Sequence, residues 1–131
     1  MFTALFSLLS LFWTAEATLT IDVANTTTRG GTIRVAVFRD NQRFLEDKPY
    51  LVRVIKDDVR SVSLPLEPGW YAIAIFHDQN NNGQLDKKLF GIPKEPYGFS
   101  NNFRPVMSAP KFSDCRLQVE RGEKRISIKL I

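Results

Sequence analysis

The oxygen-rich segment 78–86 (DQNNNGQLD) has the residue types and the spacing that suit a bound metal ion. Oxygen-bearing residues recur at every second position, starting and ending with an aspartate: Asp78, Asn80, Asn82, Gln84 and Asp86. Calcium takes roughly six to eight oxygen ligands, and a tightly curled loop directs the oxygens of alternate residues inward, while a glycine such as Gly83 permits the sharp bend. The segment therefore predicts a calcium loop of the EF-hand type, to which Gln84 contributes its backbone carbonyl.

The twelfth position of such a loop normally supplies a bidentate carboxylate, and here it is Leu89. A further acid must then come from elsewhere in the chain, and we expect Glu95, in the following loop, to supply it. We expect an affinity in the range of extracellular calcium modules, about 0.1 to 1 mM. A metal-free turn is the alternative, because Asn and Gly tolerate left-handed backbone and Asx side chains cap their own turns.

His77 precedes this loop and is the only histidine. Neighbouring residues of a strand point to opposite faces, which argues against a catalytic pair of His77 and Asp78. Ser100 lies in no nucleophile-elbow sequence, and no glycine-rich phosphate loop is present. We therefore expect a protein without catalytic activity; the rival is a metal-assisted hydrolase in which Asp78, Asp86 and His77 hold the ion.

A second unusual loop, 90–102 (FGIPKEPYGFSNN), combines prolines and glycines with aromatic residues and amides. Such a loop can cover a sheet face, or it can present rigid aromatic side chains to a ligand or partner, for instance a sugar. The residues expected to make these contacts are Phe90, Tyr97, Phe99, Asn101 and Asn102. A metal-free carbohydrate- or peptide-binding domain is thus a third functional hypothesis, and the expected partner is an envelope protein or a glycan.

The rest of the chain reads as short strands in which apolar and polar residues alternate. The expected strands are 18–24, 32–38, 50–56, 60–66, 69–77, 112–119 and 123–130. The first two are expected to form a hairpin, and only 41–47 could hold a helical turn, which disfavours a parallel sheet. The sequence predicts an all-β, about seven-stranded antiparallel sandwich, immunoglobulin-like or transthyretin-like.

The strand 69–77 is apolar on both faces, unlike the other strands. A sandwich sheet normally exposes its outer face to water, so another segment must cover this one. The segment 87–111 is the one long enough, and we expect it to fold over the strand as an ordered loop.

The overall charge and the single cysteine exclude several classes of protein. The net charge of +4 arises from scattered Lys and Arg, and they form no basic block of the kind that a nucleic-acid-binding protein carries. Cys115 alone permits no internal disulfide and no thiolate zinc site. Its apolar neighbours favour a buried core residue over a reactive thiol.

The N-terminus carries an apolar run, 2–14, followed by Ala15-Glu16-Ala17. This pattern is typical of a cleavable signal peptide, expected here to span residues 1–17 and to leave one domain at 18–131. A buried helix or first strand is the alternative, because no Lys or Arg precedes the apolar run. The run is too short for a membrane anchor, which needs roughly 20 apolar residues, so no stable membrane span is expected after cleavage.

The segment 76–102, together with Pro68-Gly69-Trp70-Tyr71, closely resembles the bacterial exported family known as domain of unknown function 2141 (DUF2141). The resemblance implies a signal peptide and a periplasmic or secreted location in a Gram-negative bacterium, and it is consistent with the sandwich. It implies no activity, because the family has none assigned. The family's two loops fall here on Asp78, Asn80, Asn82, Gly83 and Asp86, and on Gly91, Pro93, Glu95, Tyr97, Gly98 and Phe99.

Overall fold

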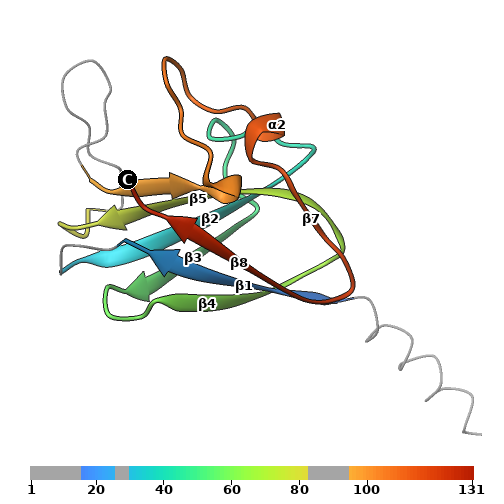
Figure 1. Ribbon diagram of the computed structural model, residues 1–131, viewed down its shortest axis with the longest axis horizontal. Helices are drawn as coiled ribbons and strands as arrows, with labels where there is room; N and C mark the ends of the chain where they lie inside the picture. Colours follow the sequence, from blue (N-terminus) through green and yellow to red (C-terminus); the bar gives the residue numbers. More distant parts are fainter. Residues whose placement is uncertain (1–15, 26–29, 83–94) are drawn as a thin grey trace, which may run out of the picture.

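The protein is an all-β sandwich of two sheets, seen in a computed structural model that describes residues 16–25, 30–82 and 95–131 (Figure 1). The smaller sheet has the order β4-β1-β8, with bounds Ser61–Leu66, Ala17–Ala24 and Gly122–Lys129. The larger sheet has the order β3-β2-β5-β6, with bounds Leu51–Lys56, Thr32–Arg39, Gly69–Asp78 and Tyr97–Phe99, and β7 (Leu117–Val119) also pairs with β5. Within the described residues the predicted all-β, antiparallel sandwich is therefore confirmed, except that β1 and β8 pair in parallel.

Aliphatic side chains fill the space between the two sheets, and we call this set the inner core. Its fully buried members alternate along the strands with more exposed residues, as a period of two requires. They include Leu19, Ile21, Val23, Ile33, Val35, Val37, Leu64, Ile73, Ile75, Ile128 and Leu130. The alternation in the sequence therefore identified the buried face of these strands correctly.

The predicted hairpin between the first two strands is wrong. β1 pairs antiparallel with β4 and parallel with β8, whereas β2 lies in the other sheet between β3 and β5. Alternation fixes which face of a strand is buried, but it does not choose the strand's neighbour. In the immunoglobulin order the first and second strands are adjacent, so the transthyretin-like alternative remains.

One edge of β5 pairs with two short strands in succession. β7 pairs with residues 69–71 and β6 with residues 74–76. In the gap between them the Ser100 hydroxyl accepts a hydrogen bond from the Ile73 backbone N–H (3.0 Å) and donates one to the Cys115 carbonyl. A buried side chain thus replaces a strand partner at this point, because a buried backbone N–H must be satisfied.

Of the strand predicted at 112–119, only the second part, β7, is a strand. The first part is a short helical turn, α2 (Phe112–Cys115), in which the Asp114 carboxylate accepts a hydrogen bond from the Lys111 N–H (2.9 Å). A 3₁₀ turn, η3 (Ser100–Asn102), follows β6. Segment 41–47 forms turns, one of them closed by Asp47 N–H donating to the Arg43 carbonyl (2.9 Å), in line with the expected helical turn.

The outer face of β5 is covered by a second apolar set, which we call the outer cluster. It consists of buried Phe38, Phe44, Ala72, Phe99 and Cys115, with Ala36, Ala74, Tyr97, Phe103 and Phe112 packed around them. The covering predicted for 87–111 is confirmed for its described part, which contributes Phe99 and Phe103, while residues 87–94 lie outside the described residues. The turn carrying Phe44 and the helical turn α2 complete the cover, and neither was predicted to do so.

The described residues contain no helix that is long and apolar enough to cross a membrane. The first strand begins at Ala17, which is buried and pairs with Leu66. Cleavage after Ala17 would leave this strand starting at Thr18, and most of the expected signal peptide lies outside the described residues.

Candidate functional site

Asp78, the first residue of the predicted calcium loop, ends β5 and is fully buried. One carboxylate oxygen, Oδ2, accepts a hydrogen bond from Arg34 Nε on β2 (3.3 Å), and the other, Oδ1, accepts from the Asn82 N–H (3.1 Å). The same N–H lies 3.2 Å from Asn80 Oδ1. The loop therefore starts as a compact Asx-type turn whose side-chain oxygens already face its own backbone.

Gly31 lets the neighbouring turn approach the base of this loop. A Cβ atom at this position would lie 2.0 Å from the Asp78 carbonyl oxygen, a distance at which the backbone would have to move. The residue also has a φ of 69°, in the left-handed region that favours glycine. Any larger residue at position 31 would therefore displace the start of the loop.

Glu95, the residue expected to supply the further acid, lies at the base of the same loop. Its side chain is 5% exposed, and its Oε2 accepts a hydrogen bond from the Gln79 N–H (2.7 Å). The next residue, Pro96, accepts a hydrogen bond from the His77 N–H (2.8 Å). Two loops that are separate in sequence are thus joined on both sides of Asp78.

The donor set that the structure brings together consists of oxygens, which suits a hard cation such as calcium. Within residues 16–25, 30–82 and 95–131, however, no group of three or more His, Cys, Asp or Glu side chains is placed to hold a metal ion. Gln84 and Asp86 lie outside the described residues, as does Phe90. Asp78 and Glu95 are thus the described carboxylates of the predicted site, and calcium binding stays a prediction.

His77 points away from Asp78. It is paired in register with Ile33 and faces the inner side of the sheet, whereas Asp78 meets Arg34 on the outer side. Its Nε2 bonds to the Gly30 carbonyl (2.6 Å), and its buried Nδ1 has no hydrogen-bond partner among the described residues. Gly30 is held from its other end too, because its N–H bonds to Asp57, an interaction that lowers the pKa of that carboxyl.

The amides predicted to contact a ligand make hydrogen bonds to the backbone of this chain. Asn101 Nδ2 donates to the Arg116 carbonyl (2.8 Å). Asn102 accepts from the Lys129 N–H (2.8 Å) and donates to the Ser127 carbonyl (3.3 Å). Both residues have positive φ values, of 63° and 51°, which asparagine tolerates better than most residues.

The aromatic pair of this loop joins the two sheets. Phe99 is buried in the outer cluster, and Tyr97, which is half-buried, lies edge-on to it at 5.7 Å between ring centroids. Tyr97 also exchanges backbone hydrogen bonds with Ile131, at 3.2 and 2.7 Å. Gly98 between them packs so closely on β8 that a Cβ atom would lie 2.8 Å from the Lys129 carbonyl oxygen. These contacts suit the covering role of the loop, and its role in ligand binding stays a prediction.

Two residues of this region were not found from the sequence. Arg34 is an ordinary polar residue in the alternation of β2, and its partner becomes visible only when the pairing of β2 with β5 is known. Ser100 was considered only as a nucleophile, and no local pattern signals that it fills a gap at a sheet edge. Both act through partners that are distant in sequence.

The two-sheet architecture and the joined loops define an all-β sandwich with an organised loop at the end of its central strand. The chain belongs to the family described as "Uncharacterized protein conserved in bacteria (DUF2141)", which matches residues 21–127. This confirms the resemblance seen in the sequence. No curated protein and no solved structure matches the chain.

Proposed function

We propose that this protein is an exported module of the periplasm or the extracellular space, without catalytic activity, that binds one calcium ion in the loop 78–86. Asp78, Asn80, Asn82, Gln84, Asp86 and Glu95 would supply the oxygens. The ion would have a structural role, fixing the loop and the adjoining segment that contacts an envelope protein or a glycan.

The observation that carries the proposal is the place of Glu95. Its carboxylate meets the Gln79 N–H directly after Asp78, so two buried carboxylates stand at the base of one loop. An EF-hand-type loop that lacks its twelfth ligand needs a carboxylate from elsewhere, and Glu95 is a buried carboxylate beside the start of this loop. Oxygen ligands that are already oriented by backbone hydrogen bonds lose less entropy when an ion binds.

Calcium titration followed by thermal unfolding tests the site. With a dissociation constant of about 0.1 to 1 mM, 10 mM calcium stabilises the folded state by about 1.4 to 2.7 kcal/mol. This corresponds to a rise in Tm of several degrees for a domain of this size. Glu95→Gln and Asp86→Asn should reduce the shift, whereas Glu123→Gln, which alters an exposed carboxylate on β8, should leave it intact. No shift in the unaltered protein at 10 mM would contradict the proposal.

The expected location has a separate test. Expression of the full chain in a Gram-negative host, followed by fractionation and intact-mass measurement, should find the protein outside the cytoplasm with Thr18 as its first residue. A full-length chain retained in the cytoplasm would contradict export without bearing on calcium.

The rival hydrolase is not favoured by the side-chain directions. A catalytic ion would have to contact both His77 and Asp78, which lie on opposite faces of β5. The glycan hypothesis is separable by a glycan array run with and without a chelator. Binding that persists in chelator would support the metal-free alternative, and binding that requires calcium would join the two loops in one function.

A further inference from the structure

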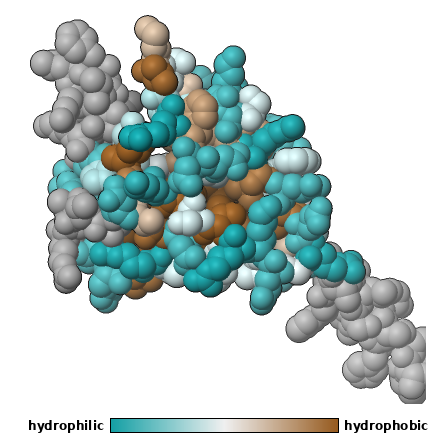
Figure 2. All heavy atoms as spheres, in the orientation of Figure 1, coloured by the Kyte–Doolittle hydropathy of each residue, from teal (hydrophilic) through white to brown (hydrophobic). Residues whose placement is uncertain are grey.

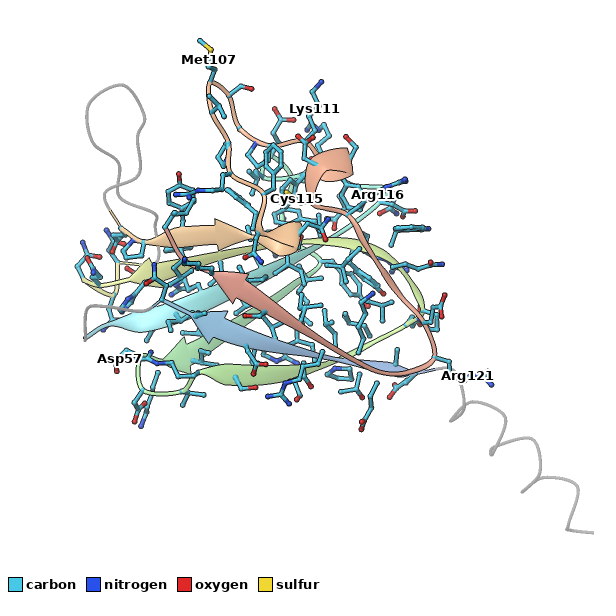
Figure 3. The ribbon with its side chains drawn as sticks, viewed as in Figure 1. Asp57, Met107, Lys111, Cys115, Arg116 and Arg121 are labelled. Atoms are coloured by element: carbon cyan, nitrogen blue, oxygen red, sulfur yellow. The ribbon has the colours of Figure 1, made fainter. Side chains whose placement is uncertain are left out.

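The loop between η3 and α2, residues 103–111, projects from the sandwich and ends in two bare hydrophobic side chains. Val106 is 92% exposed and Met107 is 96% exposed, about twice the value of any other large exposed hydrophobic side chain among the described residues. Figure 3 shows Met107 at the outer end of the projection, and Figure 2 shows hydrophobic atoms standing clear of the molecular surface there. Single surface hydrophobics are common, but here two adjacent ones are almost fully exposed at the tip of a projection.

The base of this projection is firmly attached to the protein. Phe103 and Phe112, at its two ends, both pack on the outer cluster, and Pro110 is buried. Pro105 and Pro110 fix backbone angles on either side of the tip. The tip is therefore presented by a stiff support, so little conformational entropy is lost when it contacts something.

Basic residues bracket the apolar tip. Arg104 and Lys111 stand on either side of it and are exposed, and Arg116 follows after α2. Asp114 is the only acid from 103 to 116, and its carboxylate caps α2 at the Lys111 N–H. The neighbouring turn, 40–48, carries acids as well as bases, so the excess of positive charge belongs to the projection itself.

We propose that Val106 and Met107 insert into the surface of a lipid bilayer that contains anionic phospholipid, while Arg104 and Lys111 contact its phosphate groups. Apolar side chains flanked by cations match a bilayer surface, where acyl chains lie directly beneath anionic headgroups. A lipid surface also accepts a convex apolar tip without a shaped pocket. The proposal uses none of the residues of the calcium loop, so the two can fail separately.

Vesicle sedimentation with the purified protein measures the binding. Vesicles of phosphatidylcholine with about a third phosphatidylglycerol should bind it more tightly than pure phosphatidylcholine. The double variant Val106→Ser/Met107→Ser should weaken binding to the anionic vesicles about a hundredfold. Arg104→Gln/Lys111→Gln should weaken it by about fivefold per base removed, with little change on neutral vesicles.

Val54→Ser is the matched control, because Val54 is an exposed hydrophobic residue on β3, away from the projection. It should bind vesicles as the unaltered protein does. The exposed positions make unfolding of the tip variants unexpected, and an unchanged Tm verifies this.

An environment-sensitive dye reports insertion directly and is not affected by any other apolar segment of the chain. Met107→Cys can be labelled selectively, because Cys115 is fully buried. The dye at position 107 should shift to the blue with anionic vesicles and be quenched by brominated acyl chains, whereas a dye placed by Val54→Cys should do neither. Equal binding of the tip variants and the unaltered protein would overturn the proposal, and so would a dye at position 107 that does not respond to vesicles. Either result would favour a pocket on a partner protein as the binding site for the tip.

Discussion

The five-stranded sheet separates two apolar clusters that differ in composition and in origin. The inner core is mainly aliphatic, with Tyr71 as its buried aromatic member, and comes mostly from regular strands of both sheets. The outer cluster is mainly aromatic, and its members come from β2, β5 and β6, from the turn with Phe44 and from α2. Phe44 lies at its centre, with edge-to-face contacts to Phe38, Phe99 and Phe112 at 5.0, 6.1 and 6.5 Å.

The two clusters therefore stabilise different parts of the molecule. The inner core holds the two sheets together, and its members Ile128 and Leu130 lie against Gly98 of the loop 90–102. The outer cluster anchors the segment that leads from β6 through η3 to the projecting tip and on to α2. Damage to the inner core should therefore unfold the whole domain, whereas damage to the outer cluster should first release the loops.

The largest loss of stability is expected from Ile75→Ala in the inner core. Ile75 is fully buried on the central strand, and removing its side chain should cost about 2 to 5 kcal/mol. Chemical denaturation gives the free energy of unfolding directly. Val54→Ala on the exposed face of β3 serves as the control and should stay within about 0.5 kcal/mol. If Ile75→Ala lost as little stability as the control, the assignment of Ile75 to the inner core would be contradicted.

Ser100→Ala tests the contact between the edge of β5 and α2. It should lower the free energy of unfolding by about 1 to 3 kcal/mol, because it leaves the Ile73 N–H and the Cys115 carbonyl without their buried partner. Hydrogen exchange should show faster exchange at the Ile73 amide than in the unaltered protein. Ser108→Ala, at the exposed tip, is the control and should change neither quantity. Unchanged protection at Ile73 would mean that Ser100 does not close the edge of β5.

Phe44→Leu probes the outer cluster alone. It keeps an apolar side chain but removes three aromatic contacts, so a loss of about 1 kcal/mol is expected. The sharper measurement is the reaction rate of Cys115 with a thiol reagent in native buffer, which should rise because the outer cluster opens more often. A rise of the same size per kcal/mol of stability lost in Ile75→Ala would show that the two clusters open together, which would contradict the difference drawn between them.

Cys115 should also make stability depend on alkaline pH. Burial raises the pKa of its thiol from 9.0 to about 12, with a smaller contribution from the nearby Asp114 carboxylate. The folded state therefore holds the neutral thiol, and the stability it contributes is complete below pH 9 and declines as the pH rises from 9 towards 12. Between pH 7 and 10.5 the free energy of unfolding should fall less steeply with rising pH for Cys115→Ala than for the unaltered protein. Parallel slopes would contradict the buried, neutral thiol.

The sequence predicted the inner core well and the outer cluster poorly, for a physical reason. Alternation with a period of two reports which face of a strand is buried, so residues such as Leu19, Ile33 and Ile75 were placed correctly. It also showed that both faces of β5 are buried. It could not show that Phe44 and Phe112 help to cover the outer face, because those residues lie in short turns without a periodic pattern.

Strand partners were beyond the reach of the local pattern too. β1 lies between β4 and β8, and each of these pairings depends on the whole arrangement of the sheet and not on the residues between β1 and β2. At the candidate site, the need for a further acid singled out Glu95, and the structure places its carboxylate against the Gln79 N–H, next to Asp78 in the sequence. The ion pair of Asp78 with Arg34 was not, because it follows from the register of two strands.

The position of β1 has a consequence for how the chain folds. β1 forms its parallel ladder with β8, and near its end Asn25 bonds to the carbonyl of Leu130, 105 residues further along the sequence. Residues this distant meet late, and synthesis at about 5 to 20 residues per second delays their meeting further. The smaller sheet can therefore close only after β8 has been made; β4 can pair with β1 earlier, but the other edge of β1 stays unpaired until then.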